Sequence, residues 1–268
     1  RQRQMCIRDS FYTTQKKFKI KSLLKKKTIR LLIPFLLIGL FYLIPIRFIA
    51  NYPPYESTSL IRIIYSFLTV NDCGHLWFLP TLLGIFIIAT VLIRMTKSKQ
   101  STLICIVLML YILSPYLSSF LLITSTKYLF FFFMGYFINQ YGKQIFSIKA
   151  IYHGLATLGI LLIAYVLIFH NENRVVTTFT SITIIASLYY FMPHRTNRFI
   201  LWLDKNSFGI YLFHSPLMYI IMNKFSIIAP PAILVPMNLI FGIGGSLIIT
   251  YFLRAIKCSF VIGEKNDR

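Results

Sequence analysis

Long apolar runs recur along nearly the whole chain, and short basic segments separate them. A helix needs about 20 mostly apolar residues to cross a bilayer. Lipid offers no partner for backbone N–H and C=O groups, so each crossing segment has to be helical. The sequence therefore predicts an all-α polytopic transmembrane helix bundle. We place eight spans near residues 30–50, 75–95, 102–123, 127–141, 149–170, 174–193, 207–227 and 233–256.

Composition excludes a soluble domain of this length. Hydrophobic residues make up 57% of the chain, charged residues 13%, and the mean hydropathy is +0.70. A soluble domain has roughly a quarter of its residues charged, because it must cover its surface with them. Lipid is therefore the solvent for most of this chain.

The net charge of +21 invites comparison with nucleic-acid-binding proteins, so its distribution matters. If the eight spans alternate sides, 23 of the 28 Lys and Arg residues fall on one side. Such asymmetry sets orientation, because cationic loops stay in the cytoplasm during insertion. The pattern predicts two cytoplasmic termini and no nucleic-acid partner. The remaining five Lys and Arg residues fall on the other side: Arg47, Arg62, Lys127, Arg174 and Lys224.

One membrane domain, over residues 30–256, fills most of the chain. Residues 1–10 (RQRQMCIRDS) fit no pattern, and we interpret them as a leader foreign to the protein. Residues 11–29 form a basic cytoplasmic segment suited to anionic lipid, and residues 257–268 a cytoplasmic tail. The four cysteines are scattered without a CxxC pair, which predicts neither a disulfide framework nor a thiolate metal site.

The first candidate motif is GHLWFLP at 74–80, where the second span begins. His75 could act as a general base near neutral pH, and Asp72 could orient it. Trp77 lies beside it at the membrane boundary. The alternative is an interfacial aromatic belt with a solvated histidine.

The second motif is NSFGIYLFHSPLMY at 206–219. Asn206 or Ser207 could cap a helix that begins there. A polar stripe then follows along one face of an apolar span, which is costly and usually faces a cavity or another helix. The stripe consists of Ser207, Tyr211, His214 and Met218. A purely structural hydrogen bond from His214 to a neighbouring helix is an equal alternative.

The third motif is RLLIPF at 30–35. Arg30 at a cytoplasmic boundary is either a snorkelling anchor or a group that binds a substrate phosphate. The chain contains no HExxH, no GxxxxGK[ST] and no GxSxG, which argues against a metalloprotease, a phosphate loop and a nucleophile elbow. We predict no metal site.

Four segments together resemble the acyltransferase 3 family of bacterial membrane enzymes, which acylate sugars of surface and exported polysaccharides. They occur in the family's order and are KKKTIRLLIPF at 25–35, GHLWFLPTLLGIF at 74–86, KYLFFFFMGYFI at 127–138 and SFGIYLFHSPLMY at 207–219. The resemblance implies ten spans in the bacterial plasma membrane. It also implies a cytoplasmic acyl-CoA donor, with acetyl-CoA as the default, and a sugar hydroxyl as the acceptor, without a bound cofactor.

The chain departs from the family before its first predicted span. Family members carry two further spans there, with a basic residue and the histidine regarded as catalytic, and residues 1–29 supply neither. We therefore expect a fragment whose principal catalytic residue is unknown, with His75 and His214 as candidates. Arg30 would lie near the CoA phosphates, and Trp77 would line the substrate site. The candidate oxyanion donors by residue type are His75, Tyr211 and Ser207.

Three alternatives remain at this stage. A transporter or flippase for a lipid-linked glycan would suit a polytopic chain, although the sequence has no internal repeat and few charges at mid-depth. The other large family of membrane-bound O-acyltransferases would use His214 as its central histidine. A structural or assembly role is the third alternative.

Overall fold

The computed structural model describes residues 20–56, 58–96, 99–145, 174–191, 197–225 and 229–264, with several positions between 154 and 165. Every regular element in these ranges is a helix, which confirms the predicted all-α class. The chain forms two compact units. One contains residues up to Leu129 together with Arg198 onward, and the other contains Phe130–Asn197.

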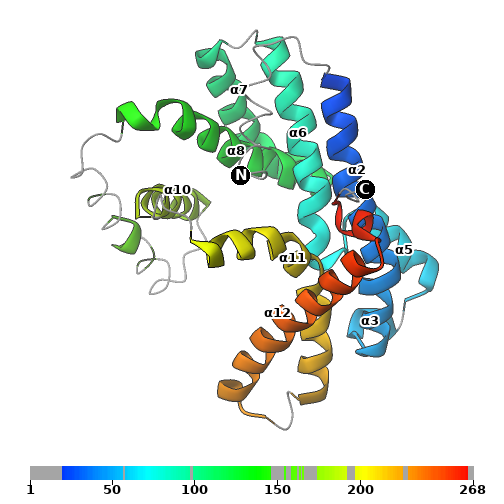
Figure 1. Cartoon of the computed structure of the whole chain (residues 1–268). Coiled ribbons are helices and arrows are strands. Elements are labelled where there is room, and N and C mark those ends of the chain that lie inside the picture. The colour runs from blue at the N-terminus through cyan, green and yellow to red at the C-terminus, as the bar shows by residue number, and fades with distance from the viewer. Residues whose placement is uncertain are drawn as a thin grey trace. The chain divides into compact units, whose positions relative to one another are not determined.

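The first unit starts with one long helical rod. α2 (Ile20–Ile38) continues through a π turn, η1 (Gly39–Leu43), into α3 (Ile44–Ile49) (Figure 1). In η1 the N–H of Ile44 reaches the carbonyl of Gly39, one residue farther back than in an α-helix. Gly39 leaves room for the ring of Phe67, because a Cβ atom at this position would overlap that ring. Phe67 also stacks on Phe35, with 4.6 Å between ring centroids.

The connection to the next long helix contains two short helices, α4 (Pro53–Glu56) and α5 (Leu60–Leu68). A 3-10 turn, η2 (Gly74–Trp77), then leads into α6 (Phe78–Met95). α6 packs beside α2, and Lys27 of α2 lies 4.7 Å from the centre of the Phe86 ring (Figure 1).

The predicted boundary between the third and fourth spans is wrong. α7 (Gln100–Leu113) ends in a 3-10 turn, η3 (Ser114–Tyr116), and α8 (Phe120–Ile145) begins where a span was expected to continue. Pro115 contributes to the early end because it has no N–H to continue the α-helical hydrogen bonds, and the backbone becomes extended at Leu117. The expected loop at 124–126 lies inside α8, and its threonine hydroxyls bond to carbonyls of the preceding turn. Thr124 donates to Phe120 O at 2.8 Å and Thr126 donates to Leu122 O at 2.7 Å.

The second unit contains the end of α8 and α10 (Arg174–Phe191). α10 covers most of the segment 174–193, and a membrane crossing there stays a prediction. Gly159 approaches Thr183 of α10 closely, since a Cβ atom there would lie 3.1 Å from Thr183 Oγ1. The span predicted at 149–170 lies mostly outside the described residues.

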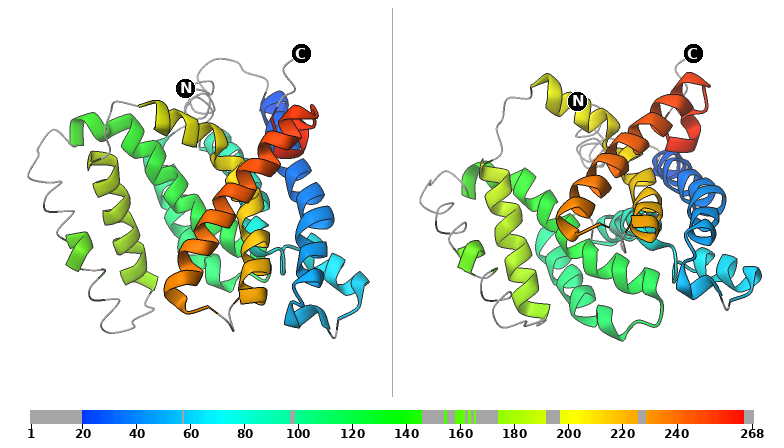
Figure 2. Two further views of the ribbon diagram at one scale, coloured as in Figure 1. Left: turned by 60° about the horizontal axis from the view of Figure 1, so that its bottom comes forward. Right: turned by 90° about the horizontal axis from the view of Figure 1, so that it is seen from below.

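α11 (Arg198–Phe225) and α12 (Pro231–Ala255) return to the first unit and pack along each other (Figures 1 and 2). Glycines allow the close approach: Gly209 faces Thr250 and Gly245 faces Leu217. α11 begins before residue 206, so the predicted cap by Asn206 or Ser207 is wrong.

Asn206 is instead buried within α11 and belongs to a hydrogen-bond network with Arg254 and Glu264. Its Oδ1 accepts a 2.7 Å hydrogen bond from Arg254 of α12. Arg254 also donates to both carboxylate oxygens of Glu264, at 2.8 and 2.9 Å. These bonds hold the final 3-10 turn, η4 (Ser259–Ile262), against α11 and α12.

Four helical segments among the described residues are long and apolar enough to cross a membrane. They are Leu24–Ile49, Gly74–Met95, Phe120–Phe137 and Pro231–Ala255. Gln100–Tyr116 and Val176–Ile185 are shorter apolar helices. The chain is therefore a multi-pass membrane protein, while eight spans and cytoplasmic termini stay predictions.

The fit of Phe67 against Gly39 yields a first test. We expect Gly39→Ala to lower the free energy of unfolding by about 1–3 kcal/mol, because the added methyl overpacks the contact. Phe67→Leu in the same chain should recover part of the loss. Thermal unfolding in detergent measures both. Gly135→Ala is the matched control, since no described atom lies within 4 Å of its added methyl. Equal midpoints for Gly39→Ala and Gly135→Ala would contradict the packing.

Candidate active site around His75 and His214

The turn η2 presents His75 at the start of α6, and Gly74 makes this turn possible. Gly74 has a φ of +51°, a backbone conformation that costs side-chain-bearing residues energy. A Cβ atom at this position would also lie 2.6 Å from Nη2 of Arg47. Glycine is thus required here by both backbone conformation and space.

Arg47, predicted from sequence only as a cation of the less basic side, is buried beside this turn with 1% of its surface exposed. Its Nη1 donates to Asp72 Oδ1 at 2.8 Å and to the Tyr55 hydroxyl at 3.1 Å. The guanidinium also lies over tyrosine rings, 4.6 Å from the centroid of Tyr52 and 5.5 Å from that of Tyr219. A buried charge is tolerated only with such partners. The cluster joins α3, the residue 72–74 loop and α11.

Asp72 therefore does not orient His75, contrary to the sequence-based expectation. Its carboxylate pairs with Arg47. The Nε2 atom of His75 instead lies 3.1 Å from the carbonyl oxygen of Leu212 in α11.

This contact fixes the protonation of the neutral His75 ring. A carbonyl can only accept a hydrogen bond, so Nε2 carries the proton and Nδ1 carries a lone pair. Nδ1 is buried and has no hydrogen-bond partner among the described residues. A buried acceptor without a partner is costly and rare in native proteins. It is the type of group that accepts a proton from a bound hydroxyl.

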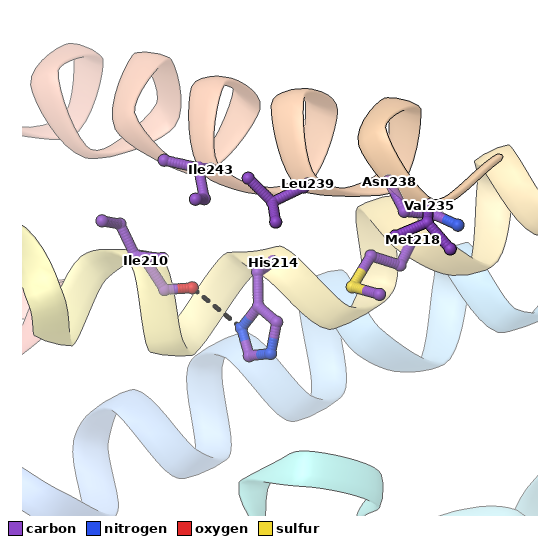
Figure 3. Close-up of a pocket in the computed structure, with 8 residues that line it drawn as sticks. Ile210, His214, Met218, Val235, Asn238, Leu239 and Ile243 are labelled. Carbon is purple, nitrogen blue, oxygen red and sulfur yellow. Dashed lines mark hydrogen bonds between the residues drawn. The ribbon is translucent and has the colours of Figure 1, made fainter. Parts of the chain in front are cut away.

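His214 is the second histidine of the site. Its Nδ1 lies 2.9 Å from the carbonyl oxygens of both Ile210 and Tyr211, so Nδ1 carries the proton and Nε2 the lone pair. The rings of His75 and His214 meet edge to face, with centroids 5.2 Å apart. Figure 3 shows the His214 ring turned away from α12.

Tyr211 holds His75 from the other side. Its hydroxyl donates a hydrogen bond to the carbonyl oxygen of His75, and the two rings lie edge to face. The Tyr211 proton is thus engaged by the protein backbone rather than left for a substrate oxyanion. In η1, the Tyr42 hydroxyl donates to the carbonyl of Phe213 at 3.3 Å, so the π turn contacts α11 just before His214.

Ser207 and Arg30 lie away from the two histidines. Ser207 is exposed and donates to the carbonyl of Asp204 in its own helix at 2.9 Å. It precedes His214 by about 10 Å along α11, at 1.5 Å per residue. Arg30 lies in the middle of α2, where Gly263 packs against its backbone. Of the predicted set, the structure brings the rings of His75, Tyr211 and His214 into contact, with Trp77 in the same turn as His75.

Trp77 belongs to an aromatic cluster next to the His75 turn. Its ring lies 5.5 Å from that of Tyr128 in α8, at an angle of 33°. Phe78 and Phe120 meet it edge-on. Aromatic faces of this kind can pack against an apolar face of a ligand.

A groove of about 360 Å³ lies between α11 and α12. Apolar side chains line most of it, with Asn238 and the Cβ side of His214 (Figure 3). The His214 ring points away from α12, so this residue lines the groove with its Cβ side and not with its ring nitrogens. Among the described residues, no three His, Cys, Asp or Glu side chains gather at a spacing that could hold a metal ion.

Comparison with known proteins identifies the class. The family model of acyltransferase 3, described as an acyltransferase domain, matches residues 10–255, nearly the whole chain. The chain belongs to the acyltransferase 3 family. No curated protein and no solved structure matches it significantly.

Membership makes this acyltransferase 3 protein a membrane enzyme that transfers an acyl group other than an aminoacyl group. It favours an enzyme over the transporter and assembly alternatives. It also confirms the resemblance drawn from the four sequence segments, among which GHLWFLP and SFGIYLFHSPLMY supply His75 and His214.

The contact between Gly74 and Arg47 can be tested with a compensating pair. Gly74→Ala should cost about 1–3 kcal/mol of stability, because its methyl meets the guanidinium and its φ is positive. Arg47→Lys removes Nη2 while it keeps the charge, so the double variant should lose less than the sum of the single variants. Thermal unfolding of the four proteins gives the coupling. Gly244→Ala, with no described atom within 4 Å, is the control. Strict additivity would rule out the contact.

Cys73 should be inert although it precedes the site. Burial, aided by the charge of Asp72, raises the pKa of its thiol to about 12. At pH 8 roughly one thiol in ten thousand would then be ionised, and only the thiolate reacts. We expect maleimide to label Cys258 but not Cys73 in the folded protein, and to label both after denaturation. Peptide mass spectrometry measures this. Equal labelling rates in the folded state would contradict the burial of Cys73.

Proposed function

We propose that the protein transfers an acyl group, acetyl by default, from acyl-CoA to a sugar hydroxyl of a cell-surface or exported polysaccharide in a bacterial plasma membrane. The acyltransferase class supports the reaction type. The observation that carries the proposed chemistry is the buried, unpartnered Nδ1 of His75 beside the ring of His214. Donor and acceptor are proposed from the resemblance described above.

In the proposed reaction, Nδ1 of His75 takes the proton from the acceptor hydroxyl. The hydroxyl oxygen bonds to the thioester carbonyl carbon, and the carbon–sulfur bond then breaks. The proton passes from the histidine to the sulfur, so that CoA leaves as a thiol. The hydrogen bond from Nε2 to Leu212 O would keep the ring in the required tautomer throughout.

The surroundings of His75 suit its role as a base. The Tyr211 hydroxyl and the Leu212 carbonyl fix its backbone and its ring, and a fixed base loses less entropy on reaching the reactive geometry. The His214 ring lies edge to face beside it, with 5.2 Å between the ring centroids. The Trp77 cluster would pack against the acceptor sugar.

Arg30 is the proposed contact for the CoA phosphates. It precedes Arg47 by about 25 Å along the helical rod, at 1.5 Å per residue. A long pantetheine arm separates the phosphates of CoA from its thioester. The two ends of the donor would therefore be bound at different depths, with the phosphates near the cytoplasmic surface.

Isosteric amides test the histidine roles. His75→Gln keeps an N–H that can bond to Leu212 O but removes the basic lone pair, so we expect a 10²–10⁴-fold loss of acyl transfer without loss of folding. His214→Asn keeps a donor for the Ile210 carbonyl and should cost less. The assay is release of CoA thiol from acetyl-CoA by protein in vesicles, with and without polysaccharide.

The controls distinguish the alternatives. Thermal unfolding should give similar midpoints for the wild type and both amide variants. Full activity of His75→Gln would remove His75 as the base. An intact thioester together with movement of a lipid-linked glycan across the vesicle would overturn the proposed donor chemistry.

A further inference from the structure

The α5 helix carries an apolar surface that the protein does not cover. At about 100° per residue, Leu60, Ile61, Tyr65 and Leu68 fall within one continuous arc of its circumference. All four side chains are exposed, and Ile61 reaches 82%. A water-facing helix would place polar side chains at these positions.

The rest of the circumference of α5 consists of a side packed against the protein and a polar side. Ile63 and Phe67 are buried against the protein, and Phe67 fits the space above Gly39. Arg62, Ser66 and Thr69 lie on the third side. Arg62 is exposed and forms no hydrogen bond or ion pair within the described residues. The helix is thus divided into a protein side, an apolar side and a polar side with a cation.

Chain connectivity places α5 at one surface of the membrane, between two candidate spans. The candidate spans Leu24–Ile49 and Gly74–Met95 flank the segment that contains it, so the chain leaves and re-enters the membrane at the same surface. α5 has nine residues and is about 13 Å long, too short to cross. It lies beside α3, whose Phe48 and Ile49 are also exposed (Figures 1 and 2).

From this arrangement we infer that α5 is an interfacial helix that binds the lipid bilayer surface. Its apolar side enters the acyl-chain boundary, and its polar side faces the headgroups. Helices of this kind bury their apolar face about 5–10 Å into that boundary. Arg62 contacts lipid phosphates, and Tyr65 suits the headgroup level, where aromatic rings gather. The lipid-facing surface of α3 thereby continues onto α5.

Lipid contact at α5 would bear directly on the candidate active site. The carbonyl of Ser66, in the last turn of α5, accepts hydrogen bonds from the backbone N–H groups of Asn71 and Asp72, at 2.9 and 3.2 Å. Asp72 is the carboxylate that pairs with Arg47, and Gly74 and His75 follow it. Lipid binding would hold α5, and α5 in turn holds the backbone of the residue that neutralises Arg47.

Fluorescence quenching in the full chain tests the inference. Ile61→Cys, at the centre of the apolar side, and Ser59→Cys, just before the helix and exposed, are labelled with an environment-sensitive dye. Their background chain has its native cysteines replaced by alanine. Reconstituted in phosphatidylcholine–phosphatidylglycerol vesicles, the Ile61 label should emit at shorter wavelength. Nitroxide lipids should quench it several-fold more, and aqueous iodide several-fold less, than the Ser59 label.

Other results would overturn the inference in identifiable ways. Strong iodide quenching of both labels would mean that the apolar side faces water. Protection of the Ile61 label from both iodide and nitroxide lipid would mean that protein covers it, and cross-linking between copies would then identify a second chain. Ile61→Asn should reduce nitroxide quenching of a label at Leu68, whereas Thr58→Asn outside the helix should not.

Discussion

The buried guanidinium of Arg47 is the interaction on which the rest of the site depends. Removing a charge from water costs several kcal/mol, and Asp72, Tyr55 and the faces of Tyr52 and Tyr219 compensate for it here. These partners come from three separate parts of the chain. By gathering them, Arg47 brings the end of the first rod, the turn that carries His75 and the helix that carries His214 into one place.

The fold class and the chemistry-bearing motifs were predictable from sequence, whereas several boundaries and pairings were not. Apolar runs of sufficient length predict helices in any membrane chain, and four described segments satisfy that rule. The turn between α7 and α8 was placed too late: it lies at Ser114–Tyr116, and polar Thr124 and Thr126, which suggested a loop, bond to carbonyls of their own helix. A sequence shows polar residues but not where their hydrogen bonds go.

In the candidate site too, the sequence indicated which residue types matter but not which residues contact one another. His75 and His214 were singled out by type and depth, but their contact joins α11 to a turn far away in the sequence. Asp72 was paired with the nearest histidine, although the structure pairs it with Arg47. The sequence did offer a clue to that pair: Arg47, near the end of one span, and Asp72, just before the next, flank a connection that contains several tyrosines. The prediction relied on the short separation of Asp72 and His75 in the sequence. It did not consider that a buried Arg47 would need a carboxylate as its partner.

The π turn at Gly39–Leu43 has a consequence for how such a protein can vary. A π turn holds one residue more than the α-helical turn it replaces, so residues before and after it are out of phase by about 100°. This offset lets Phe35 face Phe67 while Arg47 still faces Asp72. Loss of a single residue here would convert the π turn to an α-helical turn and rotate Arg47 away from Asp72 and Tyr55. Apart from Gly39, related chains should therefore tolerate changes of side chain in this turn far better than changes in its length.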